Sequence, residues 1–163
     1  MIAQLKSVSL AVAVALPALT AHEGLRHEPY DDIAGVRTVC YGETEHVEER
    51  SYSTAECLVM LATRVAGDYE APIRRCAGAE HWDGAPTEVR ATHIGVAYNI
   101  GVSGWCGSSM RRRLDHGDID GSCDALLKWD RARVHGRLTV VQSLAERRRE
   151  EREFCLSYPR EAQ

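Results

Sequence analysis

Hydrophobic residues repeat at helical spacing in several stretches of the chain after residue 50. The segment 53–56 reads Ser-Thr-Ala-Glu, the form of a capping box, and an apolar periodic stretch follows it to about residue 68. A second helix is predicted over residues 86–99, because Pro, Thr and Glu open it and two glycines after it would end it. Three further helices are predicted over residues 110–115, 122–131 and 142–156. In the last of these, Leu144, Phe154 and Cys155 are expected to face inward.

The segment that precedes these helices has a different pattern. Asp31, Asp32, Gly35 and Gly42 surround a run rich in β-forming residues, 36–41, which predicts a short antiparallel hairpin or small sheet. No internal repeat, Gly/Ser-rich linker or low-complexity tract is visible in the sequence. The pattern as a whole predicts an α+β fold that is mostly helical, with a small β-hairpin subdomain beside a helical lobe.

The first 21 residues, MIAQLKSVSLAVAVALPALTA, form an apolar segment in which Lys6 is the only charged residue. This layout is typical of an export signal. The stretch is short and rich in Ala for a permanent transmembrane helix, and Pro17 weakens it further. Three interpretations are open: a cleaved signal peptide, a permanent anchor, and a weakly hydrophobic anchor that exports the chain and later leaves the bilayer uncleaved.

The third interpretation is favoured because of Glu23, which is considered below as a catalytic residue. Cleavage near Ala21 would leave Glu23 as the second residue of a frayed terminus. A permanent anchor would hold it at the membrane surface, where no cleft could form around it. We therefore predict an apolar signal-anchor helix over residues 1–21, with the host secretion machinery and inner membrane as its partners, and a domain over residues 22–163.

The composition agrees with a globular domain rather than a disordered chain, since 44% of the 163 residues are hydrophobic and 27% are charged. Residues 1–109 hold 8 Lys and Arg against 14 Asp and Glu, whereas residues 110–163 hold 12 against 10. An anionic polymer would therefore be expected to bind the C-terminal part of the chain. A solvated helix face of mixed charge explains the same numbers, and the positive excess is too weak to indicate nucleic acid.

The chain contains six cysteines, Cys40, Cys57, Cys76, Cys106, Cys123 and Cys155. They are dispersed without a Cys-x-x-Cys pair, which argues against a zinc site and favours disulfides in an oxidising compartment such as the periplasm. Six buried thiols in a cytosolic protein are the alternative. Six cysteines allow fifteen pairings, and the sequence alone does not select one. Sequential pairing (40–57, 76–106 and 123–155) is favoured, because each bond closes a loop of modest length.

Two carboxylic residues near the N-terminus have the character that glycosidic cleavage requires. One carboxyl must stay protonated to give its proton to the leaving oxygen, and the other must be ionised to activate water or attack. Glu23 follows an apolar run, so partial burial could raise its pKa. Asp32 follows a turn among polar neighbours, and the hydroxyl of Thr38 could hold an attacking water. Acidic pairs at this spacing are mostly surface charges, so spacing alone is weak evidence, and Asp31 is a second candidate for the ionised carboxylate.

The same residues resemble the catalytic hairpin of the phage lysozymes of glycoside hydrolase family 24. Glu23, Asp32 and Thr38 match the Glu–Asp–Thr pattern of that family. Further matching segments are GLR at 24–26, PY at 29–30, GV at 35–36, VCYG at 39–42, AYNIG at 97–101, and Leu144, Arg147, Arg148 and Glu151 in the last predicted helix. The resemblance covers roughly residues 22–156.

The resemblance implies a lysozyme-like fold and an endolysin, a muramidase that hydrolyses the β-1,4 linkage between N-acetylmuramic acid and N-acetylglucosamine in peptidoglycan. It implies Glu23 as general acid, Asp32 as the carboxylate that activates water and Thr38 as the residue that positions it, with inversion of configuration. Glu43 stands where family members usually have His, and Ser143 where they usually have Gly. The first departure puts in doubt any contact made by that His, and neither removes a catalytic group.

The apolar N-terminus is similar to that of a branch of the family, the signal-anchor-release endolysins. These are exported, held inactive at the periplasmic face of the host inner membrane and then released to fold in the periplasm. In some members a cysteine inside the anchor triggers activation, but no cysteine precedes Cys40 here. The hypothesis is therefore activation by refolding alone, with the freed segment completing the helix that carries Glu23.

Three residues are candidates for sugar binding. Tyr41 and Trp105 could stack on sugar rings, and Asn99 could donate hydrogen bonds from its amide. The alternative is that the two aromatic residues are ordinary half-buried side chains and that Asn99 braces a helix end. The arginines at 147–149 are expected to form a salt-bridged helix face with neighbouring glutamates rather than a substrate clamp.

No metal or cofactor is expected, because the seven histidines show no metal-ligand spacing. The expected partner is peptidoglycan, and the protein is expected to be a monomer. A lytic transglycosylase needs only one catalytic acid, so the presence of Asp32 and Thr38 argues against that enzyme. A non-catalytic, disulfide-braced cell-wall-binding or membrane protein of the same fold is the rival from another class, and it would not be affected by Asp32→Asn.

Overall fold

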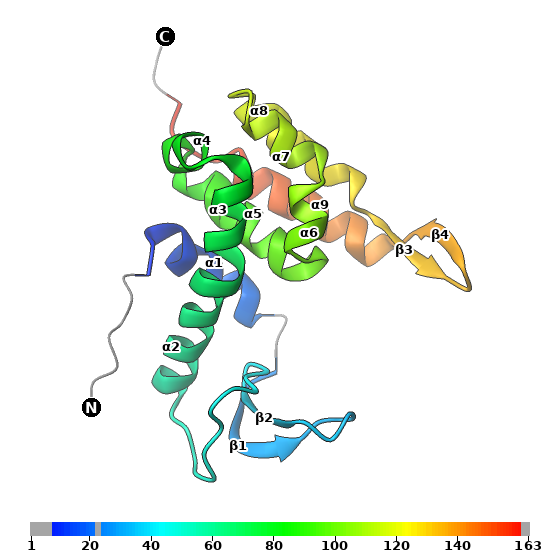
Figure 1. The fold of residues 1–163 in the computed structure, drawn as a ribbon. Helices are drawn as coiled ribbons and strands as arrows, with labels where there is room; N and C mark the ends of the chain where they lie inside the picture. The colour runs from blue at the N-terminus through cyan, green and yellow to red at the C-terminus, as the bar shows by residue number, and fades with distance from the viewer. Residues whose placement is uncertain (1–7, 22–23, 161–163) are drawn as a thin grey trace.

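The computed structural model describes residues 8–21 and 24–160 of the chain. Figure 1 shows a helical lobe, a small hairpin at the far end of helix α2, and a second hairpin that projects from the helical lobe. The helices are α1 (Leu10–Thr20), α2 (Thr54–Arg64), η1 (Val65–Glu70), α3 (Ala71–Ala77), α4 (Ala79–Gly84), α5 (Thr87–Ile100), α6 (Val102–Cys106), α7 (Ser109–Leu114), α8 (Ile119–Asp124), η2 (Ala125–Lys128) and α9 (Gln142–Cys155). The strands are β1 (Arg26–Asp31), β2 (Arg37–Cys40), β3 (Arg131–Val134) and β4 (Arg137–Val140).

Helix α5 is the centre of the core, and α1, α6 and α9 pack against it. Val89 and Ile94 of α5 are fully buried, and so is Val12 of α1. Small side chains such as Ala11 and Ala15 let α1 approach α5 closely. The described part of the predicted signal-anchor segment is therefore a core helix of the domain and not a separate appendage.

Among residues 8–21 and 24–160, no helix is long and apolar enough to cross a membrane. Helix α1 has 11 residues and includes Pro17. Ser9 caps its first turn, since the Ser9 hydroxyl accepts a hydrogen bond from the backbone N–H of Val12 at 3.1 Å. The structure thus gives α1 the place of a short helix in a globular core.

The capping box predicted at residues 53–56 is confirmed. The hydroxyl of Ser53 accepts from the backbone N–H of Glu56, and the Glu56 carboxylate accepts from the backbone N–H of Ser53. Helix α2 then continues through the π-helical segment η1 into α3, so one helical stretch connects the first hairpin with the helical lobe (Figure 1).

The predicted helices at 86–99, 110–115 and 142–156 are confirmed as α5, α7 and α9. The predicted helix at 122–131 is wrong at its end, because the helical stretch closes at Lys128 and Arg131 begins a strand. Phe154 was expected to face inward but is 43% exposed, whereas Cys155 is buried. The sequence patterns did not reveal α3, α4, α6 or the β3–β4 hairpin.

The disulfides Cys40–Cys57, Cys76–Cys106 and Cys123–Cys155 confirm the sequential pairing. Each bond joins two different elements of the fold: β2 with α2, α3 with α6, and α8 with α9. The bonds restrict the unfolded chain and so stabilise the fold, by about 2–4 kcal/mol each in typical cases.

A series of buried hydrogen bonds crosses the helical lobe at His93 of α5. The indole N–H of Trp105 donates to Nδ1 of His93 at 3.1 Å, and Nε2 of His93 lies 3.2 Å from the hydroxyl of Ser122. Because Nδ1 accepts, the proton of the neutral ring is on Nε2. Complete burial lowers the pKa of His93 from its usual value to about 4.

This pKa predicts a loss of stability in mild acid. The unfolded chain binds a proton at His93 near pH 6.5, whereas the folded protein does so only near pH 4, so the stabilisation is complete above pH 6.5 and is lost as the pH falls. We expect urea unfolding to show a decrease of about 3 kcal/mol between these values from this group alone. The His93→Gln variant should have a lower free energy of unfolding at pH 7, and this free energy should depend less on pH between 6.5 and 4. The matched control is His81→Gln at an exposed position. If His93→Gln keeps the same pH dependence as this control, the lowered pKa of His93 is contradicted.

Candidate active site

Asp32 is held in a fixed orientation by the turn between β1 and β2. Its Oδ1 atom accepts from the backbone N–H groups of Ala34 and Val36, both at 2.8 Å. Its own backbone N–H donates to the carbonyl oxygen of Val36 at 3.0 Å. Gly35 has a φ of 76°, a left-handed conformation that glycine adopts without strain. The carboxylate therefore uses Oδ1 for the turn, and among the described residues no hydrogen bond to Oδ2 is found.

The same residue, Val36, also orients Thr38. The Thr38 hydroxyl donates to the carbonyl oxygen of Val36 at 2.9 Å, and the Thr38 side chain is only 4% exposed. Because the hydroxyl proton is used in this bond, the oxygen lone pairs of Thr38 can accept a hydrogen bond from water. Asp32 and Thr38 are thus both held by backbone groups of Val36, the carboxylate by its N–H and the hydroxyl by its carbonyl oxygen.

The register of the hairpin separates Asp32 from Asp31. Asp31 pairs with Arg37 and Tyr30 pairs with Thr38, and side chains alternate between the two faces of a strand. Asp32 therefore shares a face with Thr38, whereas Asp31 lies on the opposite face with Arg37. There the Arg37 guanidinium lies 3.3 Å from Asp31 and also binds Glu49, whose pKa it lowers through their hydrogen bond.

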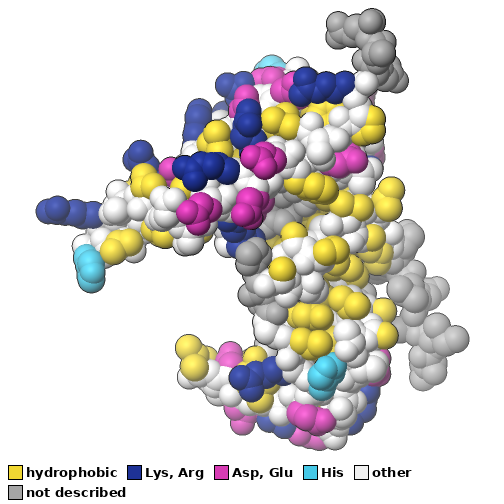
Figure 2. Space-filling view, turned by 180° about the vertical axis from the view of Figure 1, so that it is seen from behind, with side chains coloured by type: hydrophobic (Ala, Val, Ile, Leu, Met, Phe, Trp, Pro, Cys, Tyr) yellow, Lys and Arg dark blue, Asp and Glu magenta, His cyan; other side chains and the backbone are white. Residues whose placement is uncertain are grey.

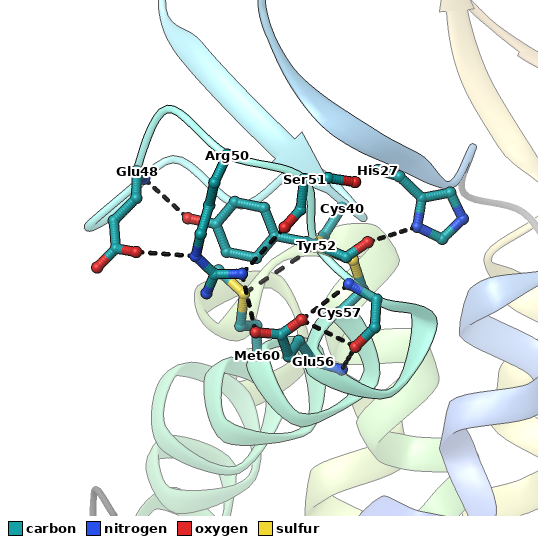
Figure 3. A network of polar contacts seen from close by, with 10 residues as sticks. His27, Cys40, Glu48, Arg50, Ser51, Tyr52, Glu56, Cys57 and Met60 are labelled. Carbon is teal, nitrogen blue, oxygen red and sulfur yellow. Dashed lines mark hydrogen bonds and ion pairs between the residues drawn. A yellow bond between two sulfur atoms is a disulfide. The ribbon is translucent and has the colours of Figure 1, made fainter. Parts of the chain in front are cut away.

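A polar network fixes the hairpin to the start of α2 (Figure 3). The Nδ1–H of His27 donates to the carbonyl oxygen of Tyr52 at 2.7 Å, and the Tyr52 N–H donates back to the His27 carbonyl at 2.8 Å. The Tyr52 hydroxyl accepts from the N–H of Glu48, and Arg50 lies over the Tyr52 ring. Figure 3 shows the Cys40–Cys57 disulfide beside this network. The hairpin is consequently tied to α2 by covalent and polar contacts.

Arg64 makes a second connection, between the end of β2 and the core. Its guanidinium donates to the carbonyl oxygens of Tyr41 and Gly42 and, at 2.7 Å, to the hydroxyl of Tyr98 in α5. Sequence reasoning missed this residue, because an arginine at the end of a predicted helix shows no sign of a distant partner. Its effect is to fix the hairpin relative to the helical lobe.

The sugar-binding candidates have different environments. Trp105 is 0% exposed and Tyr41 7% exposed, so a sugar could reach neither ring in this conformation. The two side chains pack in the core instead, Trp105 edge-on against Trp82. Asn99 lies at the exposed end of α5, and its Oδ1 accepts from Arg148 at 2.8 Å. It therefore braces the helix end while its amide nitrogen remains a potential donor.

Arg148 is a cation in the core, fully buried although it belongs to a run of three arginines. Its guanidinium lies 3.0 Å from the carboxylate of Glu151, which also binds Arg147 at 2.9 Å. Burial lowers the pKa of Arg148, and the charge of Glu151 opposes that shift. The predicted salt-bridged helix face is found at Arg147 and Glu151, but Arg148 points into the protein and is not on a solvated face.

Glu23 lies outside the described residues, so its position relative to Asp32 and Thr38 is not part of this geometry. Asp32 and Thr38 both lie in or beside the β1–β2 hairpin and both contact the backbone of Val36. In the part of the chain that the structure describes, no group of three or more His, Cys, Asp and Glu residues is arranged to hold a metal ion.

The model of the phage lysozyme family matches residues 20–151 of the chain. The chain is 31% identical over 136 residues to a SAR-endolysin of Bacteriophage PS119, covering 82% of this chain and 76% of the relative. It is 32% identical over 136 residues to a SAR-endolysin of Enterobacteria phage P21, with 82% and 77% covered. A mutant of P22 lysozyme has a similar structure, with a TM-score of 0.71, 24% identity, and 93% and 99% of the two chains covered.

The chain therefore belongs to the phage lysozyme family. Within that family it is a lysozyme of the SAR-endolysin type, and the predictions of a lysozyme-like fold and of a muramidase endolysin are confirmed. Peptidoglycan is the substrate that this membership implies.

Glu151 offers a test of the buried cation. Glu151→Gln would leave Arg148 in the core without a counter-charge, and removal of one partner of a buried ion pair typically costs about 3–5 kcal/mol. We expect the lower end of this range, because the Glu151 side chain is 19% exposed. The matched control is Glu146→Gln on the same helix, an exposed carboxylate that accepts only from Gln142 among the contacts described and should change stability by less than about 0.5 kcal/mol. Equal effects in urea unfolding would contradict the role given to Glu151.

Proposed function

We propose that Glu23, Asp32 and Thr38 form the catalytic set of an inverting muramidase that cuts the β-1,4 linkage between N-acetylmuramic acid and N-acetylglucosamine. The observation that carries this proposal is the contact of both residues with Val36, whose N–H binds the Asp32 carboxylate and whose carbonyl oxygen binds the Thr38 hydroxyl. A carboxylate and a hydroxyl fixed in this way are suited to hold one water between them.

In the proposed reaction, Glu23 protonates the leaving glycosidic oxygen while Asp32 accepts a proton from the attacking water. Thr38 accepts a hydrogen bond from the same water and fixes its direction. An inverting enzyme needs about 6.5–9.5 Å between its two carboxyl groups, to leave room for that water. The free oxygen of the Asp32 carboxylate is the acceptor, since its partner oxygen is occupied by two backbone N–H groups.

The two neighbouring aspartates provide a matched test. Asp32→Asn keeps an acceptor oxygen for the turn but removes the base, so we expect the rate of hydrolysis of purified peptidoglycan to fall by about 100-fold or more. Asp31→Asn removes an exposed ion pair on the opposite face and should retain at least half of the activity. Both variants should unfold at nearly the same temperature as the wild type. Clearing of peptidoglycan by Asp32→Asn at the wild-type rate would favour the rival view of a non-catalytic wall-binding protein.

We further propose that residues 1–21 are a signal-anchor-release segment, delivered by the host secretion machinery to the inner membrane and released uncleaved into the periplasm. The burial of Val12 and Leu19 against the core supports this, because the catalytic domain needs the segment after release. Three disulfides support a periplasmic location. The proposed active form is a monomer whose substrate is peptidoglycan. Whether the freed segment completes a helix through Glu23 concerns residues outside those described.

Truncation tests this part of the proposal. A chain that lacks residues 1–18 loses most of α1, leaves the apolar side of α5 exposed, and should be insoluble or inactive after oxidative refolding. A chain that lacks residues 1–7 keeps α1 and its Ser9 cap and should be active. A folded, fully active protein without residues 1–18 would refute the requirement for the segment. A mass shortened by 21 residues after export of the full chain would identify a cleaved signal peptide.

A further inference from the structure

The β3–β4 hairpin has a composition unlike the rest of the helical lobe. It is a regular four-pair antiparallel ladder closed by a two-residue turn, in which His135 and Gly136 both have left-handed backbone conformations. Three of its ten residues are arginines, Arg131, Arg133 and Arg137, and none is acidic. A turn of this type makes a well-defined projection rather than a loose loop.

Most arginines of α7 and α9 lie close to a carboxylate, whereas those of the hairpin do not. Arg111, Arg147 and Arg152 are each within 3.0 Å of a carboxylate. On the hairpin, Arg131 lies 3.7 Å from Asp130. Among the described residues, no carboxylate is within ion-pair distance of Arg133 or Arg137. The hairpin therefore carries three closely spaced arginines without a close counter-charge.

Apolar side chains accompany these charges. Leu138 is 64% exposed and Val140 50% exposed. Directly opposite residues of an antiparallel pair project to the same face, and the register pairs Arg131 with Val140 and Arg133 with Leu138. One face of the hairpin therefore presents the guanidinium groups of Arg131 and Arg133 on β3 beside the aliphatic side chains of Val140 and Leu138 on β4. Such a surface suits a ligand that carries both carboxylates and methyl groups.

The position of the hairpin indicates which ligand that is. Figure 2 shows a deep hollow in the surface, bounded on one side by the arm that carries β3 and β4 and on the other by the arm that carries β1 and β2. Asp32 and Thr38 belong to the second arm. A glycan strand bound in the hollow would thus pass beside the β3–β4 hairpin. The stem peptides on alternate sugars of peptidoglycan contain free carboxylates and alanine methyl groups.

We propose that the β3–β4 hairpin binds the anionic stem peptides of peptidoglycan and gives the enzyme a preference for peptide-bearing over peptide-free glycan strands. Arg131 and Arg133 donate to stem-peptide carboxylates, and Leu138 and Val140 on the same face contact the alanine methyl groups. This inference rests on the hydrolysis proposed above, and it names the part of the substrate that lies outside the scissile bond.

The test compares two substrates with one triple variant. Arg131→Gln/Arg133→Gln/Arg137→Gln is assayed on uncrosslinked glycan strands that carry stem peptides and on strands stripped of peptides by an amidase. We expect kcat/KM to fall about tenfold or more on the peptide-bearing strands, since charged hydrogen bonds contribute strongly, and less than about twofold on the stripped strands. The difference should shrink at high salt, because the contacts are exposed.

A matched control removes the same charge elsewhere. Arg75→Gln/Arg112→Gln/Arg160→Gln alters exposed arginines of α3, of α7 and of the chain after α9, and it should treat both substrates as the wild type does. Unfolding temperatures of both triple variants show whether either change disturbs the fold, and Leu138→Ser/Val140→Ser provides a second, charge-neutral variant. The latter should also lose preference for the peptide-bearing strands.

The outcomes separate the inference from the proposed function. If the wild type cuts neither substrate, the proposed hydrolysis itself fails. If the wild type cuts both and the hairpin variants keep its preference, the hydrolysis stands and the stem-peptide assignment is overturned. Loss of binding to phosphatidylglycerol-containing vesicles in the hairpin variants, with substrate preference unchanged, would also overturn it and identify the hairpin as a contact with the membrane surface.

Discussion

The contact between α1 and α5 is the interaction on which the rest of the structure depends. Val12 and Leu19 fill the core beside α5, and without them the apolar side of the central helix would face water. Only residues 22 and 23 separate the C-cap of α1 from the described residues that lead into β1. The helix that completes the core therefore also determines where the β1–β2 hairpin begins, so the stability of the core and the position of this hairpin have a common origin.

This constraint explains the composition of the N-terminal segment. A strongly hydrophobic segment would remain in a bilayer, and a polar one could not cover α5. The alternation of Ala and Val around Ala11 and Ala15 suits the core, because small apolar side chains pack closely on a neighbouring helix, and the 11 residues of α1 are too few to span a bilayer, as the proposed release requires. Pro17 is tolerated since α1 needs few turns to cover its partner.

Local chemistry made much of the fold predictable. The capping box at Ser53 and the strand of the first hairpin depend on neighbouring residues, so the sequence predicted them correctly, whereas the roles of Asp32 and Thr38 remain predictions. Features that depend on distant partners were missed. Arg148 looked like part of a solvated helix face and is buried because Asn99 and Glu151 lie beside it, and Trp105 is enclosed by the core. The sequence predicted no element over residues 132–140, where the β3–β4 hairpin lies, because a His-Gly turn is a weaker signal than Asn-Gly.

The two hairpins are attached to the helical lobe in different ways, and this difference suits different tasks. The β1–β2 hairpin is fixed by a disulfide, by the Tyr52 network and by Arg64, and the proposed positioning of a water by Asp32 and Thr38 requires such a fixed hairpin. Among the described residues, the β3–β4 hairpin has no disulfide and no side-chain hydrogen bond to a helix, and most of its side chains are exposed. Under the proposed stem-peptide binding, long arginines on such a projection can adjust to a flexible peptide while the sugar chain is held below them. Rigidity is then found at the proposed catalytic residues, and adaptability where the variable part of the polymer passes.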